Sequence, residues 1–271
     1  MSLLWRDEIG IHLSPSRVLL IRVERGLKPR IAEQHEHAIV CGDWNDWTAP
    51  LGVLAQLLER PQWRGAGTRI VLCDCWVRYA LVPWVAELSS AEEQLSHARQ
   101  VLIRLYGSAV SEWEIRLSQA PPGQARVACA MPGALLNSLR DIRTRHKLKL
   151  TSLQPQLLAA YDNWRHRLPT AGAWFVTIGE GTMAAARLGS VTWDRVHSVR
   201  IGSDWTRDLN RLQTFGRLAS TRPDEGHVYV DAPAAWREEA GPAAKAIHWL
   251  EDDSGPKGTL QQLGRMRRLA A

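Results

Sequence analysis

The sequence has no long hydrophobic run and few cysteines, and these two absences narrow what the protein can be. No apolar segment approaches the roughly 20 residues that a membrane-spanning helix needs. The start of the chain also lacks the charged-then-apolar layout of a signal peptide. The 4 cysteines in 271 residues do not suggest a disulfide framework in a long chain without a secretory signal. We therefore expect a folded cytoplasmic protein.

Motifs typical of enzymes and metal sites are also missing. The chain has no Ser/His/Asp motif, nucleophile elbow or glycine-rich P-loop, so we expect no catalytic activity. Cys73 and Cys75 flank Asp74 on a predicted strand, and buried reduced thiols are the stronger interpretation because no further metal ligands stand at matched spacing. His35 and His37 would share one strand face and could suit Zn²⁺, but no third ligand is apparent. We favour an exposed polar face there and expect no metal.

Tryptophan and positive charge are what the sequence has in excess. It contains 13 Trp against 2 Phe. Trp is favoured where a large ring buries its body and pairs its N–H, which includes interfaces as well as cores. The formal net charge of +6 permits an acidic partner, although charge is evidence about association rather than fold.

Two basic runs stand out in the sequence. Anionic lipid head groups would attract such side chains, and the first run would also be favourable at a helix C-terminus. Nucleic acid would attract them too, but no recognition motif with interleaved aromatic residues accompanies them, so we expect no nucleic-acid partner. The runs are Arg140, Arg143, Arg145, His146, Lys147 and Lys149, and Arg265, Arg267 and Arg268.

Hydrophobic periodicity predicts an α/β fold in which a three-strand meander opens each half of the chain. Short apolar runs bounded by Gly, Pro and Ser mark the strands. The expected strands cover residues 8–13, 17–24, 30–40, 68–74, 76–84, 112–118, 126–131, 148–153, 173–178, 182–188, 191–199 and 227–231.

Capping residues and apolar stripes predict the helices. Ser89 or Ser90, with Glu92 or Glu93 three residues later, offers a capping box. Thr48 can cap another helix that has a proline in its first turn. The expected helices begin at Thr48, after Ser90, after Gly133, at Pro155 and at Ser203, and a last one covers residues 243–250.

One strand-turn-strand pattern occurs twice, over Gly10–Ile21 and over Val176–Ala186, and in both copies the strand position just before the turn lacks a carboxylate. A small-residue turn exposes backbone N–H groups that can form a nest for a phosphate. Nucleotide-bound Mg²⁺ usually also needs a carboxylate, because it prefers oxygen ligands. His12 and Thr177 precede the two turns and supply none. In the second copy a tight hairpin is the stronger interpretation, since Glu180 would repel an anion.

The order of these blocks resembles the actin-like superfamily, and within it the PilM-type proteins of type IV pilus assembly and the related cytoplasmic domains of type II secretion. The resemblance implies an α/β, actin-like (ribonuclease H-like) fold with two lobes. Residues 1–168 would form the first lobe, with a small α+β subdomain inserted over 75–149, and 169–271 a shortened second lobe. The blocks that carry it are Gly10–Ile21, Val77–Trp84, Leu153–Tyr161 and Thr177–Gly202.

Three departures from the family pattern argue against ATP binding. The family's first phosphate loop reads Asp-x-Gly where this chain has His12-Leu13-Ser14, and its second begins with Asp where this chain has Thr177. Its Gly-Gly adenosine turn is absent after Val230-Asp231. We therefore expect degenerate phosphate loops and no cofactor. The residues of these loops are His12, Ser14, Ser16, Thr177, Gly179, Gly181 and Thr182.

By resemblance, the chain would be a non-catalytic bacterial adaptor or scaffold, cytoplasmic and peripheral to the inner membrane. It would hold the cytoplasmic segment of a single-span, PilN-like partner in a pilus or type II secretion assembly platform. The basic runs could add membrane association, and a homodimer stays open. The alternative is a divergent ATP-binding protein or ATPase of the superfamily that uses other residues. The expected partner-binding residues are Trp76, Arg78, Tyr79 and Trp84.

Overall fold

The computed structural model describes residues 7–24, 30–179, 181–202, 205–218, 227–233, 236 and 247–250. The chain divides into two compact units. Within the described ranges, the first unit runs to Trp76 and resumes over Ala134–Asn163, and the second takes Val77–Gly133 and continues from Trp164. Residues 134–149 therefore group with the first unit, although the sequence placed them in the inserted segment. In the described part, no helix is both long and apolar enough to cross a membrane.

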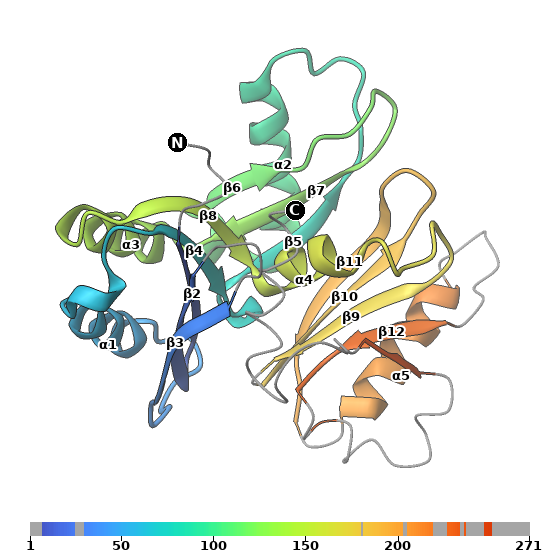
Figure 1. The fold of residues 1–271 in the computed structure, drawn as a ribbon. Coiled ribbons are helices and arrows are strands. Elements are labelled where there is room, and N and C mark those ends of the chain that lie inside the picture. The colour runs from blue at the N-terminus through green and yellow to red at the C-terminus, as the bar shows by residue number, and fades with distance from the viewer. Residues whose placement is uncertain are drawn as a thin grey trace. The chain divides into compact units, whose positions relative to one another are not determined.

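A five-stranded sheet organises the first unit, with the strand order β3-β2-β1-β4-β8 (Figure 1). The first three strands form an antiparallel meander, and β4 runs parallel to both β1 and β8. The central strand β1 is buried along its whole length, whereas the edge strand β3 is largely exposed. The elements are β1 (Glu8–Ser14), β2 (Arg17–Glu24), β3 (Arg30–Ala38), β4 (Gly67–Leu72) and β8 (Lys149–Pro155), with the helices α1 (Thr48–Leu58), α3 (Gly133–Arg145) and α4 (Gln156–Trp164).

The second unit repeats this sheet topology. Its five-stranded sheet has the order β11-β10-β9-β12-β13, again an antiparallel meander followed by two parallel strands. Trp174 of the central strand and Trp205 of the following helix lie in its core. Both predicted meanders are thus confirmed. The elements are β9 (Trp174–Gly179), β10 (Thr182–Leu188), β11 (Trp193–Arg200), β12 (Val228–Asp231) and β13 (Ile247–Trp249), with α5 (Trp205–Leu218).

The second unit also contains a three-stranded antiparallel sheet in the order β5-β7-β6. The helix α2 packs on it, because Ala98 and Leu102 are buried in one cluster with Ala80, Ala128 and the neighbouring apolar side chains of the strands. In the same unit, β11 contacts β5. The elements are β5 (Arg78–Val82), α2 (Ala91–Tyr106), β6 (Glu114–Leu117) and β7 (Arg126–Met131).

Local hydrogen bonds lie at the start of two helices, and in α2 they form a cap. In α2, the N–H of Glu93 donates to Oγ of Ser90 at 3.1 Å, and Oε2 of Glu93 accepts from the N–H of Ser90 at 2.9 Å. The predicted capping box is confirmed, and these hydrogen bonds lower the pKa of Glu93. In α1, Thr48 is the first helical residue rather than the cap. Its N–H and hydroxyl donate to Oδ1 of Asp46 at 2.8 and 2.6 Å, which lowers the pKa of that carboxyl.

The structure corrects three predicted elements. The helix over 243–250 is wrong in its described part, because Ile247–Trp249 is a strand that pairs in parallel with β12; residues 243–246 lie outside the described residues. A run this short and apolar fits the period of a helix as well as that of a strand. Pairing with the neighbouring strand determines that it is extended. Strand β4 ends at Leu72, and Asp74–Trp76 forms a short 3-10 helix, η3, instead of continuing the strand. The strand predicted over 76–84 is limited to β5. The expected helix start at Ser203 lies outside the described residues.

Candidate functional site

The first candidate phosphate loop is a closed hairpin between β1 and β2. Ser14 pairs with Arg17, which leaves only Pro15 and Ser16 in the turn. The hydroxyl of Ser14 donates to the carbonyl of Arg17 at 3.2 Å, and the carbonyl of Ser16 accepts from the N–H of Ile39 at 2.7 Å. His12 lies further back in the strand and is buried. No carboxylate therefore stands at the position where the family pattern has one.

The second candidate loop, between β9 and β10, has the same form. Gly179 pairs with Thr182, and Gly181 in the turn has φ of +65°, a left-handed conformation that suits glycine. The carbonyl of Gly181 accepts from the N–H of Ile201 at 3.1 Å. Thr177 is 1% exposed, and its hydroxyl donates to the carbonyl of Ala184 at 3.4 Å. The interpretation as a tight hairpin is confirmed, while Glu180 lies outside the described residues.

Asp231 is an acidic residue that the sequence analysis did not assign to a site. It ends β12 and pairs in register with Thr177 of β9, so the two side chains project from the same face of the sheet. Its side chain is buried. The signal in the sequence was an acid at the end of a short apolar strand. Within the second unit, a carboxylate thus stands one strand away from the position where the family pattern has one.

A second buried acid, Asp74, caps a helix in the first unit. Both of its carboxylate oxygens accept from the N–H of Leu157, at 3.2 and 3.1 Å, at the start of α4. A helix N-terminus is a ready site for a phosphate because its N–H groups are free and its dipole is positive. Here the protein's own carboxylate occupies that position. The flanking Cys73 and Cys75 are buried free thiols. Burial raises the pKa of Cys75, and its contact with the Cys73 thiol raises it further.

Two of the four expected partner-binding residues are buried and cannot present a side chain to a partner. Trp76 is 2% exposed, and its Nε1–H donates to the carbonyl of Trp44 at 3.2 Å. Tyr79 is also buried, and its carbonyl accepts from the hydroxyl of Tyr106 at 2.7 Å. Burial raises the pKa of Tyr106. For Trp76 and Tyr79 the sequence prediction is corrected, because apolar packing and hydrogen bonds hold both rings in the core.

Arg78 lies between aromatic rings at the start of β5. Its guanidinium carbon is 5.9 Å from the ring centre of Tyr106 and 5.7 Å from that of Trp113. Its Nη1 also donates to the carbonyl of Val77 at 2.9 Å. These contacts are cation–π interactions in a partly desolvated site. They give Arg78 a structural role in joining β5 to its neighbours.

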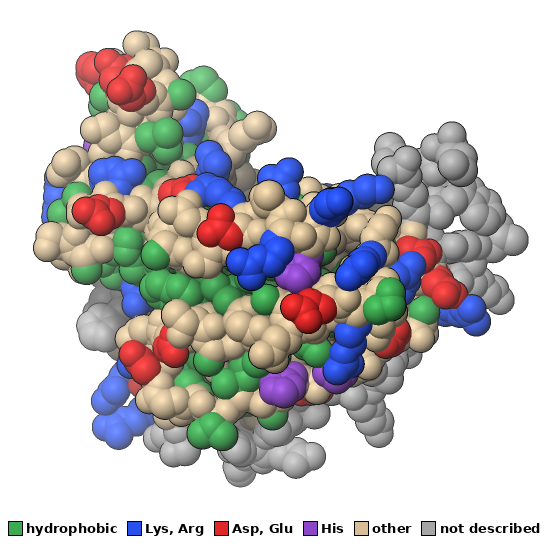
Figure 2. All heavy atoms as spheres, turned by 90° about the vertical axis from the view of Figure 1, so that its left-hand side faces the viewer, with side chains coloured by type: hydrophobic (Ala, Val, Ile, Leu, Met, Phe, Trp, Pro, Cys, Tyr) green, Lys and Arg blue, Asp and Glu red, His purple; other side chains and the backbone are tan. Residues whose placement is uncertain are grey.

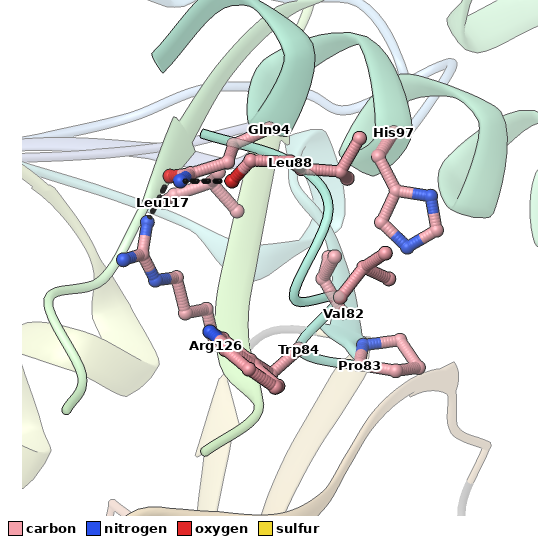
Figure 3. Close-up of a pocket in the computed structure, with 9 residues that line it drawn as sticks. Val82, Pro83, Trp84, Leu88, Gln94, His97, Leu117 and Arg126 are labelled. Atoms are coloured by element: carbon pink, nitrogen blue, oxygen red, sulfur yellow. Dashed lines mark hydrogen bonds between the residues drawn. The ribbon is translucent and has the colours of Figure 1, made fainter. Parts of the chain in front are cut away.

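Of the four expected partner-binding residues, Trp84 is the one with an exposed side chain. It is 45% exposed and lies at the edge of a small pocket that opens to solvent (Figure 3). One side of the pocket is held by polar contacts, since Nη1 of Arg126 donates to Oε1 of Gln94 at 2.6 Å and Nε2 of Gln94 donates to the carbonyl of Leu88 at 3.1 Å. The rest of the wall is mainly apolar. The lining residues are Val82, Pro83, Trp84, Val85, Leu88, Gln94, His97, Leu117 and Arg126.

The first basic run lies at the end of α3 and in the turn that follows. Leu135, Leu139 and Ile142 form the buried stripe of the helix, and Lys147 takes a left-handed φ of +52° in the turn. The exposed cations of this segment are called the α3 basic cluster: Arg140, Arg143, Arg145, Lys147 and Lys149.

Most of the α3 basic cluster has no acidic partner among the described residues. Arg143, Arg145, Lys147 and Lys149 make no ion pair with another described residue. α1 and α3 lie on the left in Figure 1, and Figure 2 shows the molecule from that side. On this face, Lys and Arg side chains are interspersed with acidic and hydrophobic ones. The second basic run, which is Arg265, Arg267 and Arg268, lies outside the described residues.

His35 and His37 lie on the edge strand β3, pairing in register with Leu20 and Val18 of β2. His37 is exposed and His35 partly so, as expected for a polar strand face. Among the residues that the structure describes, no group of three His, Cys, Asp or Glu side chains could hold a metal ion.

Comparison with known proteins gives matches only among solved structures, since no protein-family model and no curated protein matches the chain. The PilM–PilN type IV pilus biogenesis complex matches with a TM-score of 0.67 and 14% identity, over 97% of this chain and 96% of that one. The cytoplasmic domain of EpsL, an inner-membrane component of the type II secretion system of Vibrio cholerae, matches with a TM-score of 0.60 and 10% identity, over 98% and 95%.

A third solved structure is described as having an actin-like ATPase fold. It is a Bacteroides thetaiotaomicron protein with an actin-like ATPase fold and unknown function, which matches with a TM-score of 0.61 and 9% identity over 98% of each chain. Identities this low support a conclusion about fold alone. The repeated sheet order in the two units agrees with it. The chain therefore has the actin-like ATPase fold that its sequence predicts.

Proposed function

We propose that this protein is a non-catalytic scaffold on the cytoplasmic side of an inner membrane, in an assembly platform of the type IV pilus or type II secretion kind. The observation that carries the proposal is the state of the two hairpins. Both are kept as tight turns in an actin-like fold, and the positions before them hold the buried His12 and Thr177 instead of carboxylates. Neither position supplies the carboxylate through which a nucleotide-bound Mg²⁺ is usually held.

The proposed partner is the cytoplasmic segment of a PilN-like membrane protein. The support is the likeness to the PilM–PilN complex over nearly the whole chain, together with the pocket beside Trp84. An apolar pocket with one exposed tryptophan and a fixed polar edge suits an extended peptide that inserts an apolar side chain. Partner binding would thus take place on the three-stranded sheet and α2.

A scaffold in this position would also face anionic lipid. The α3 basic cluster supplies five exposed cations within ten residues, with Asp141 as the one acid among them. Clusters of this size are attracted to the negative surface of a membrane, with about 1 kcal/mol for each cation near the surface. We propose that the cluster contributes to peripheral membrane association.

Mg-ATP should not stabilise the protein. A ligand at 100 times its Kd raises the free energy of unfolding by about 2.7 kcal/mol, so a melting experiment at millimolar Mg-ATP reports even weak binding. We expect the melting temperature to stay unchanged, because neither His12 nor Thr177 offers a carboxylate to the metal. Mg²⁺ with inorganic phosphate is the control for effects of ionic strength. A clear rise with Mg-ATP alone would contradict the proposal.

The alternative function, a divergent ATP-binding protein or ATPase, has one observation in its favour. Asp231 is buried one strand away from Thr177 and could replace the missing acid of the second hairpin. If Mg-ATP stabilises the protein and the substitution Asp231→Asn removes that effect, the alternative is correct. Loss of the effect in both Asp231→Asn and an unrelated surface variant would instead indicate nonspecific binding.

Binding to anionic vesicles should depend on the α3 basic cluster. We expect the protein to cosediment with vesicles that contain phosphatidylglycerol and not with phosphatidylcholine vesicles, and the bound fraction should fall as salt is raised. The substitutions Arg143→Glu and Lys147→Glu should weaken binding by at least about tenfold, because together they remove two attractive contacts and add two repulsive ones. The matched control is Arg116→Glu, an exposed arginine on β6. If the variant with Arg143→Glu and Lys147→Glu binds the vesicles as tightly as the Arg116→Glu control, the α3 basic cluster is not the membrane-binding site.

A further inference from the structure

Two histidines that lie far apart in the sequence meet at the edge of the second five-stranded sheet. His227 directly precedes β12, and His248 is the middle residue of β13. Nδ1 of His227 and Nε2 of His248 are 3.1 Å apart, and the two ring centres are 5.2 Å apart. Both side chains are exposed. The pair was not visible in the sequence, because 21 positions separate its members.

The surrounding contacts fix the backbone of both residues and the ring of His248. The ring of Tyr229 stacks on that of His248, with centres 4.8 Å apart and planes at 18°. The carbonyl of His227 accepts from the N–H of Trp174 at 2.9 Å, which ties this residue to the central strand β9. On the other side, the N–H of Leu250 donates to the carbonyl of Val230 at 2.9 Å, just beyond β13. Backbone pairing thus brings the two residues together, and ring stacking places the imidazole of His248, before any ligand arrives.

The separation of the two nitrogens fits joint coordination of one metal ion. Imidazole nitrogens bind Zn²⁺ at about 2.0–2.1 Å, so two of them lie about 3.3–3.4 Å apart at a tetrahedral angle and about 2.9 Å apart at a right angle. The observed 3.1 Å falls between these values. Neutral imidazole is a ligand for Zn²⁺, Ni²⁺ and Cu²⁺, whereas Mg²⁺ and Ca²⁺ prefer oxygen.

We propose that His227 and His248 form a two-histidine site for a borderline divalent transition-metal ion of the Zn²⁺, Ni²⁺ and Cu²⁺ class. Among the described residues, no third His, Cys, Asp or Glu joins them. The bound ion links β13 to β12 and thereby stabilises the edge of the sheet. In the absence of metal, the two rings share a hydrogen bond instead.

The test uses untagged protein freed of metal with a chelator and titrated with NiCl₂ in a calorimeter. We expect one ion per chain and a rise in melting temperature on binding, since a ligand that binds only the folded state stabilises it. Either His227→Gln or His248→Gln should lower the affinity at least about tenfold. MgCl₂ should have no effect. Melting curves in chelator show whether each variant is folded.

The matched control is the double variant His35→Gln with His37→Gln, which removes two histidines from another edge strand and should bind Ni²⁺ like the parent. Three results would overturn the proposal. These are the absence of saturable binding by the parent, unchanged binding by both single variants, and loss of binding in the control alone. The last would move the site to β3. The outcome is independent of whether the protein is a scaffold.

Discussion

Replacing Trp76 with alanine should strongly destabilise the fold, whereas replacing Trp84 should leave stability unchanged and abolish most partner binding. Trp76 is 2% exposed and hydrogen-bonded to the carbonyl of Trp44, so its loss leaves a large cavity and should lower the free energy of unfolding by about 3–5 kcal/mol. Trp84 is 45% exposed at the pocket edge. Its truncation should weaken binding by about 2 kcal/mol or more, which is roughly thirtyfold.

The two variants are compared by measuring chemical denaturation and peptide binding on the same samples. The probe is the cytoplasmic segment of a single-span protein encoded beside this one in its genome. The control is Leu105→Ala, because Leu105 is 60% exposed on α2 and does not line the pocket. If the Trp84→Ala variant binds the segment as tightly as the parent, the pocket is not the partner site.

Restoring acids at both hairpins, through His12→Asp with Thr177→Asp, should destabilise the protein without creating an ATP site. Both positions are buried, and an uncompensated buried charge typically lowers stability by about 3–5 kcal/mol. At Thr177 the new carboxylate would stand beside Asp231 on the neighbouring strand. Two carboxylates this close repel each other, which raises one pKa and favours its protonated form. We therefore expect a lower melting temperature and no response to Mg-ATP.

A double-mutant cycle isolates the repulsion. Thr177→Asp should be less destabilising when combined with Asp231→Asn, because the neighbouring charge is then absent. Thr177→Val is the control for losing the hydroxyl alone, and it should lower the free energy of unfolding by only about 1 kcal/mol. Tight binding of Mg-ATP by the variant with His12→Asp and Thr177→Asp would show that the hairpins still form a nucleotide site once the two acids are present, which contradicts the proposal.

Most of the elements could be predicted from the sequence because their signals are local. Short apolar runs between small-residue turns define the two meanders, and both predicted hairpins form, with Ser14 pairing with Arg17 and Gly179 with Thr182. The capping box of Ser90 and Glu93 lies within a single helical turn. The absence of carboxylates at positions 12 and 177 is likewise read from the sequence alone.

Only the tertiary structure decided which residues the fold brings together. Asp74 accepts a hydrogen bond from the N–H of Leu157, 83 positions later, at the start of α4. The strand predicted to include Asp74 ends before it, at Leu72. Trp76 and Trp84 carry the same side chain at the two ends of one predicted strand, yet packing buries the first and leaves the second exposed.

The same reason applies at the far end of the second sheet. Ile247–Trp249 is too short for a period to distinguish helix from strand, so pairing with β12 decides. That pairing then places His248 beside His227. Local patterns determine which elements form, whereas contacts between distant segments depend on packing, which no short stretch of sequence encodes.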